Sequence, residues 1–65
     1  MIKDLTPRQK EVMRKLACGL QNKQIAYEMN LSEATVKLHM SGLFVRLGVR
    51  NRTAAILKAV ELHLI

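Results

Sequence analysis

The chain has 65 residues, with eleven Lys and Arg against five Asp and Glu, so its formal net charge is +6 at pH 7. A chain of this length is one domain at most and buries only about 60% of the surface that it exposes when unfolded, which excludes an enzyme with separate cofactor and substrate domains. The charge favours a polyanionic partner, a nucleic acid or an acidic membrane surface, and the 3% aromatic content argues against a single-strand platform that stacks bases on several rings.

The first predicted helix covers residues 7–18. Thr6 is a good N-cap, Pro7 suits the first helical position, and Gln9 can complete a capping box. Gly19 is placed to end the helix in the left-handed conformation. Apolar residues recur at three- and four-residue intervals and predict one buried stripe, made of Val12, Met13, Leu16, Ala17 and Leu20.

The second predicted helix covers residues 22–29, and its inner face consists of Ile25, Ala26 and Met29. Asn30 follows, a residue that tolerates a left-handed turn better than most. Leu31 is apolar within that turn, so we expect it to fill the core between two helices. Ser32 is a good N-cap for the helix after it.

The third predicted helix covers residues 33–47. At 100° per residue, its inner face consists of Val36, Met40, Leu43 and Leu47, bordered by Phe44. The opposite face consists of Ala34, Leu38, Ser41 and Val45, flanked by Lys37. Gly42 costs about 1 kcal/mol relative to Ala in the middle of a helix, and it predicts the close approach of another group. Gly48 ends the helix.

The fourth predicted helix covers residues 52–63 and is capped by Asn51. Its inner face consists of Ala55, Ile56, Ala59, Val60 and His63. The helix and chain end offer more apolar surface than one core face needs, in Leu57, Leu62, Leu64 and Ile65. Two interpretations stand: a homodimer seam, or residues that wrap the edge of the core. The expected fold class is all-α, a compact four-helix bundle.

Residues 22–41 match the helix-turn-helix template at four fixed offsets. Ala26 is small where the two helices cross closely, and Asn30 can adopt positive φ in the turn. Leu31 supplies the apolar residue that must follow, and Val36 supplies the β-branched core residue of the second helix. This agreement of four positions is a stronger indication than the charge alone.

A recognition helix places its outer, amino-terminal half in the major groove of DNA. The predicted base contacts are therefore Ala34, Lys37, Leu38 and Ser41. Lys37 can bond guanine or a phosphate, and Leu38 can pack on a thymine methyl group, although an isolated surface leucine is also common. The predicted phosphate contacts are Asn22, Lys23, Thr35, Arg46 and Arg50.

Charge placement supports the same surface, because no carboxylate lies between Glu33 and Glu61. That interval contains Lys37, Arg46, Arg50, Arg52 and Lys58. We therefore expect the net positive charge to be concentrated on the second half of the chain, where it would meet phosphates.

The sequence offers nothing for catalysis or metal binding. Cys18 has no partner for an internal disulfide, which indicates a reducing compartment, and we expect it to be a small buried hydrophobe. His39 and His63 are interpreted as structural residues, since no Cys or carboxylate surrounds them at ligand or triad spacing. No segment is long and apolar enough to be a membrane span. We expect no enzyme activity, cofactor, metal or small-molecule ligand, and a cytoplasmic location.

Taken together, four segments resemble the LuxR/FixJ-type DNA-binding domain of bacterial regulators. They are LTPR at residues 5–8, NKQIA at 22–26, LSEATVKLH at 31–39 and LGVRNRT at 47–53. The resemblance implies four helices, with the second and third forming the helix-turn-helix and the last pairing with its copy. It also implies that Lys37, Leu38 and Ser41 face the major groove and that Lys23 and Thr35 touch phosphates.

The chain departs from that family at three positions. Gln21 stands where an N-capping Ser or Thr is usual, and residues 9 and 24 are Gln where Glu is common. The cap of the second helix is then weaker by ~1 kcal/mol, or Asn22 takes over the role. Family members usually carry this domain after a receiver or autoinducer-binding domain. We expect residues 1–65 to be a single helix-turn-helix domain without one, as a fragment or a free-standing regulator.

The leading hypothesis is a transcription regulator that binds double-stranded DNA sequence-specifically as a homodimer, with a seam of Leu57, Glu61 and Leu64. A sigma-factor-like promoter-binding region shares the LTPR start, but the connector at 48–52 and the fourth helix argue against it. A protein-interaction module remains the alternative from a different class, with Leu57, Leu62 and Leu64 as its partner surface.

Overall fold

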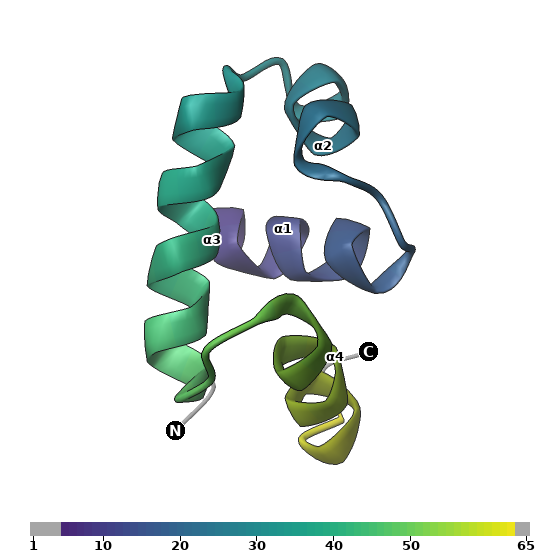
Figure 1. Cartoon of the computed structure of the whole chain (residues 1–65), viewed down its shortest axis with the longest axis vertical. Coiled ribbons are helices and arrows are strands. Elements are labelled where there is room, and N and C mark those ends of the chain that lie inside the picture. The colour runs from purple at the N-terminus through teal and green to yellow at the C-terminus, as the bar shows by residue number, and fades with distance from the viewer. Residues whose placement is uncertain (1–4, 64–65) are drawn as a thin grey trace.

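The computed structural model of the chain describes residues 5–63, and over that range it is an all-α globule of 28 × 20 × 19 Å. The described residues form four helices and no strand: α1 (Pro7–Ala17), α2 (Asn22–Met29), α3 (Glu33–Leu47) and α4 (Arg52–Glu61). In Figure 1, α3 stands upright at one side while α2 and α4 lie at its upper and lower ends, with α1 between them. The expected fold class and helix order are confirmed.

The helix starts follow the expected capping chemistry. The Thr6 side chain accepts a hydrogen bond from the Gln9 backbone N–H, and Gln9 Oε1 accepts from the Thr6 N–H, both at 3.0 Å. Ser32 caps α3 and Asn51 caps α4 in the same way. These bonds satisfy amide groups that have no partner inside the helix.

The start of α2 differs from what a strong cap would give. Gln21 occupies the N-cap, and its backbone N–H donates to Gln24 Oε1 at 2.8 Å. Asn22 does not take over the role, because it is already the first helical residue and its Oδ1 accepts a hydrogen bond from Arg52. The Gln24 side chain thus replaces the Ser or Thr cap by half of a capping box, through the backbone of Gln21.

Two helices end slightly earlier than their sequences predict. The first ends at Ala17, because Cys18 already leaves the helix ahead of Gly19, whose φ is +85°. The fourth ends at Glu61, because His63 adopts a left-handed φ of +58°. Asn30 and Gly48 adopt the left-handed conformation at the ends of α2 and α3, as expected.

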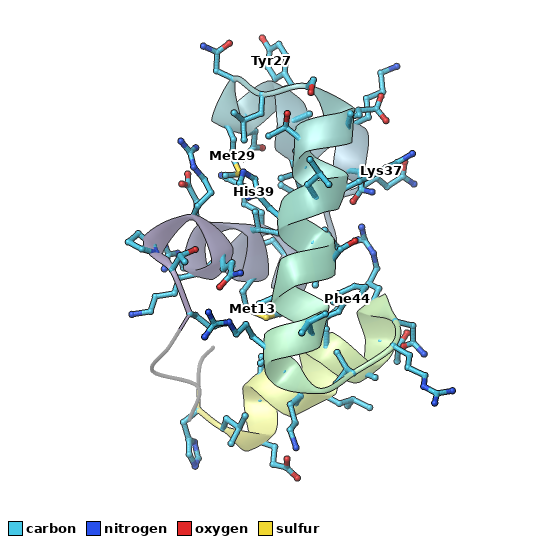
Figure 2. The ribbon with its side chains drawn as sticks, turned by 90° about the vertical axis from the view of Figure 1, so that its left-hand side faces the viewer. Met13, Tyr27, Met29, Lys37, His39 and Phe44 are labelled. Atoms are coloured by element: carbon cyan, nitrogen blue, oxygen red, sulfur yellow. The ribbon has the colours of Figure 1, made fainter. Side chains whose placement is uncertain are left out.

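The core draws on all four helices. Its buried members within the described range are Leu5, Val12, Met13, Leu16, Ile25, Ala26, Met29, Val36, Met40, Leu43, Leu47, Ala55 and Ala59. Leu31 and Phe44 are half-buried against this cluster, so the turn residue and the border residue both pack as expected. Figure 2 shows Met13 behind α3, in the space that α1 and α3 share.

Three residues expected inside the protein are exposed. Cys18 lies about 200° round the helix from the buried Leu16, which turns it to solvent. Val60 lies about 100° from Ala59 and is 54% exposed. His63 is exposed because the left-handed turn has already ended α4. The inner face of α4 is therefore narrower than the apolar pattern predicts.

Besides the core, two local features determine how α1 lies against α3 and α2. A Cβ atom at Gly42 would lie 3.0 Å from Gln9 Nε2, so Gly42 admits the start of α1 against the middle of α3. This is the close approach that a glycine in mid-helix predicts. Between α1 and α2, Lys15 Nζ lies 2.8 Å from Glu28 Oε1, and this hydrogen bond raises the pKa of Lys15 above its usual value.

Candidate nucleic-acid interface

The turn between α2 and α3 fixes the angle at which α3 is presented. Asn30 has φ 57° and ψ 45°, and the Leu31 N–H donates to the Ala26 carbonyl at 2.9 Å. Leu31 is half-buried beneath the turn. Ala26 is buried and Leu31 packs against the same core cluster as the inner face of α3, so the turn and the core together hold α3 on the scaffold.

The outer face of α3 is exposed from end to end. All four predicted base contacts lie there: Ala34, Lys37, Leu38 and Ser41. Leu38 is 73% exposed, and two turns further along, Val45 is 79% exposed. In Figure 2, Lys37 extends away from the helix while His39 lies on the side that faces the other helices. The helix thus buries one face and exposes the other, which carries Ala34, Leu38 and Val45 with the hydroxyl of Ser41 and is flanked by Lys37.

A hollow at the start of α2 is lined by residues of the segment before α2 and of α2, α3 and α4. Its lining consists of Gly19, Gln21, Asn22, Lys23, Glu33, Lys37 and Arg52. Two predicted phosphate contacts, Asn22 and Lys23, therefore share one hollow with the predicted base contact Lys37. Sequence reasoning did not place Glu33 and Arg52 there. The hollow contains the cationic side chains of Lys23, Lys37 and Arg52 and one carboxylate, that of Glu33, so its net charge is positive.

Arg52 has a different role from the other basic residues of its segment. Its Nη1 donates to the Leu20 carbonyl at 2.6 Å and its Nη2 donates to Asn22 Oδ1 at 3.2 Å, and the guanidinium is partly buried. The guanidinium of Arg52 thus bonds groups of the protein itself. A cation in the first turn of a helix opposes the helix dipole, and that anomaly is the sequence signal that could have identified this residue.

Thr35 lies in the first turn of α3 beside its cap. Ser32 Oγ accepts from the Thr35 N–H at 3.1 Å, and the two hydroxyl oxygens lie 2.9 Å apart with Ser32 as donor. A hydroxyl has one hydrogen to donate, so in this arrangement Thr35 keeps its own hydrogen for a partner such as a phosphate.

The remaining predicted phosphate contacts lie outside the hollow. Arg46 is exposed in the last turn of α3 and Arg50 is exposed in the connector to α4. Arg46 is nine residues beyond Lys37, which is about 13 Å along the helix axis. The structure therefore places the predicted phosphate contacts in two groups, one at each end of the outer face of α3.

The expectation that the charge is concentrated on the second half is wrong. Residues 1–32 contain six basic and three acidic residues, a net +3, and residues 33–65 contain five basic and two acidic residues, again +3. Three of the basic residues in the first half, Arg8, Lys10 and Arg14, are exposed on α1. The interval without carboxylates is real, but it does not make the charge distribution one-sided.

The exposed side of α4 is partly apolar. Leu57 is 65% exposed and lines a shallow surface hollow with Ala54, Lys58 and Glu61, in which Lys58 Nζ lies 3.4 Å from Glu61 Oε1. Leu64, the third residue predicted for a seam, lies outside the described residues. Among residues 5–63 the structure groups no three His, Cys, Asp or Glu side chains in a way that could hold a metal ion. In the same range every helix is too short or too polar to span a bilayer.

The sequence is similar to regulators from several bacteria. It is 53% identical over 51 residues to the nitrate/nitrite response regulator protein NarP of Escherichia coli (strain K12), which covers 78% of this chain and 24% of that protein. It is 46% identical over 58 residues to the transcriptional regulatory protein LnrK of Bacillus subtilis (strain 168), covering 89% of this chain and 26% of that protein. The chain spans about a quarter of the length of these curated relatives.

Solved structures show the same arrangement of helices. The response regulator ChrA of a heme-sensing two-component system superposes with a TM-score of 0.90 at 46% identity, over 94% of this chain and 30% of that one. The transcription factor GerE superposes with a TM-score of 0.83 at 35% identity, over 92% of this chain and 90% of that one. A family model described as bacterial regulatory proteins of the luxR family matches residues 3–59. With its helix-turn-helix and exposed α3 face, the chain belongs to the luxR family of bacterial regulatory proteins and is a helix-turn-helix DNA-binding domain of that family.

Proposed function

We propose that this chain binds double-stranded DNA sequence-specifically by placing α3 in the major groove, and that it does so as a homodimer in the bacterial cytoplasm. The observation that carries the proposal is the outer face of α3, where Ala34, Lys37, Leu38 and Ser41 are all exposed on a helix whose opposite face is buried. A helix of this kind fits the major groove, and its side chains have chemistry that discriminates base edges.

Phosphates on either side of the groove would be bound by two sets of residues, one at each end of this face. Lys23, Asn22 and Thr35 would act at its amino-terminal end, and Arg46 and Arg50 at its other end. Such contacts fix the register of a protein on the duplex but carry no sequence information. The base contacts would then account for specificity and the two flanking groups for most of the affinity.

Homodimer formation would use the exposed side of α4, with Leu57 and Glu61 and, beyond the described residues, Leu64. A two-fold seam presents the same residues from both copies, so two α3 helices would meet two half-sites. The exposed apolar area at Leu57 supports this arrangement. We propose a binding domain rather than an enzyme, with residues 1–65 as a single helix-turn-helix domain.

Arg50→Ala should weaken binding to all duplexes alike, because a phosphate contact is blind to sequence. In titrations at several salt concentrations, log K should fall linearly with log salt for the unaltered chain, and the slope should become shallower by about 0.9 in the variant. Lys10→Ala removes the same charge from α1, beside Arg14 and His63 in a separate hollow, and should leave the slope as it is. Binding that does not depend on salt in the unaltered chain would contradict the proposal.

Leu57→Glu should abolish dimer formation on DNA, because it places a carboxylate four residues from Glu61 on the seam and repeats this repulsion in the other copy. Sedimentation of the complex with a selected duplex should show two chains per duplex for the unaltered protein and one for the variant. Leu57→Met, which keeps an apolar side chain, should behave as the unaltered protein. Two chains per duplex in Leu57→Glu would refute the seam.

A further inference from the structure

Helices α2 and α4 do not pack against each other in the part of the chain that the structure describes, yet one side chain joins them. Arg52, the first residue of α4, donates at 2.6 Å to the carbonyl of Leu20, ahead of α2, and at 3.2 Å to Oδ1 of Asn22, the first residue of α2. The two ends of this link are thirty residues apart in the chain. A partly buried guanidinium with two acceptors is preorganised, so it fixes the groups that it bonds.

The chemistry of the donor decides how Asn22 is oriented. A guanidinium carries five N–H donors and no acceptor, so only the amide oxygen of Asn22 can face it. The amide nitrogen must then point elsewhere, and it donates no hydrogen bond within the described residues. Asn22 lines the hollow that also contains Lys23 and Lys37. Arg52 thus leaves the Asn22 side chain as a hydrogen-bond donor in a hollow with two lysines and one carboxylate, that of Glu33.

We propose that Arg52 is a positioning residue of the DNA interface, which holds the Asn22 amide with its nitrogen toward a duplex phosphate and its oxygen toward the protein. This inference rests on the proposed function, since it concerns how the start of α2 meets DNA. It assigns to Arg52 a role that its charge alone does not suggest: the residue contributes to binding without touching the nucleic acid.

The direct test is Asn22→Asp. An aspartate can still accept from Arg52, with the added strength of a charge-assisted bond, and a carboxylate in the first turn suits the helix dipole. Thermal unfolding should therefore occur at the same or a higher temperature than in the unaltered chain. The phosphate, however, would meet an acceptor in place of a donor.

The matched control is Gln21→Glu, which places the same charge on the neighbouring residue, exposed in the same hollow, and keeps the Asn22 donor. The probe is a pool of random-sequence duplexes of ~20 base pairs, about two helical turns, at low salt. Asn22→Asp should bind this pool at least about tenfold more weakly than Gln21→Glu, the loss expected for one hydrogen bond to a charged group. Equal affinity of the two variants would overturn the inference.

A double-mutant cycle tests the role of Arg52 itself. Arg52→Ala and Asn22→Ala should each weaken binding to the same pool. The double variant should bind no more weakly than the single variant with the lower affinity, because either substitution already removes the oriented Asn22 donor. Additive losses would show that Arg52 acts independently of Asn22 and would overturn the inference. If Arg52→Ala does not fold, the comparison of Asn22→Asp with Gln21→Glu still tests whether the Asn22 amide donates to a phosphate, which the inference requires. Absence of binding by the unaltered chain would refute the proposed function, whereas binding with equal losses in that pair would refute the Asn22 phosphate contact and with it the role of Arg52, and would leave the placement of α3 in the major groove untouched.

Discussion

Leu43→Ala is expected to unfold a large fraction of the molecules at 37 °C. Leu43 is fully buried on the inner face of α3 and belongs to the core cluster to which all four helices contribute. Truncating a buried leucine costs about 2–5 kcal/mol, through lost burial and the cavity left behind. A domain of this size has a total stability of roughly 3–10 kcal/mol, so one substitution removes much of it. Circular dichroism during heating should show a fall in Tm of about 10 °C or more.

The control for this prediction is the same substitution five residues earlier. Leu38 is 73% exposed on the outer face of the same helix, so Leu38→Ala removes the same atoms without a core cavity. Its effect on the free energy of unfolding should stay within about 0.5 kcal/mol. If the two variants melted at similar temperatures, the division of α3 into a buried and an exposed face would be wrong.

Lys37→Ala is expected to cause the largest loss of DNA binding among the exposed residues of α3. If Lys37 bonds guanine, discrimination at one base pair should drop by about 1–3 kcal/mol, roughly a 5- to 150-fold change in relative affinity. If it bonds a phosphate, binding to all sequences should weaken and the salt slope should become shallower by about 0.9. A gel-shift titration with matched and single-base-changed duplexes separates the two cases.

The fold should survive this change, because Lys37 is exposed and makes no hydrogen bond or ion pair among the described residues. Lys10→Ala is the matched control: it removes the same charge from an exposed position on α1, which carries no predicted DNA contact and no seam residue. It should leave discrimination between bases unchanged. Binding by Lys37→Ala equal to that of the unaltered chain would refute both roles of Lys37.

The sequence predicts the helices well because each is bounded by local chemistry. Thr6, Ser32 and Asn51 are capping residues, and Asn30 and Gly48 are residues suited to left-handed turns, so the signals at both ends of a helix lie within a few residues of it. The inner face of α3 follows from periodicity, since one wide core covers it. Where the core is narrow, at α4, the same periodicity overestimates burial, and Val60 is exposed.

The candidate site is predictable only in part, because some of its geometry depends on contacts between distant residues. The template identifies the outer face of α3 from spacing alone. The hollow at the start of α2 depends on how α2, α3 and α4 are placed relative to one another, which no local pattern specifies. The hydrogen bonds of Arg52 to Leu20 and Asn22 span some thirty residues. The sequence shows only that a cation occupies the first turn of the predicted fourth helix, which marks the residue as unusual but does not identify its partners.

Selection of bound duplexes from a random pool tests the central claim most directly, because the bound DNA sequence emerges from the selection itself. If α3 reads bases in the major groove, successive rounds should enrich one half-site, repeated with two-fold symmetry about one helical turn apart. The same selection with Leu38→Ala should lose the preference for thymine at one position of that half-site, since the methyl contact is gone. A pool that remains random after repeated rounds, although the unaltered chain is folded, would contradict the account.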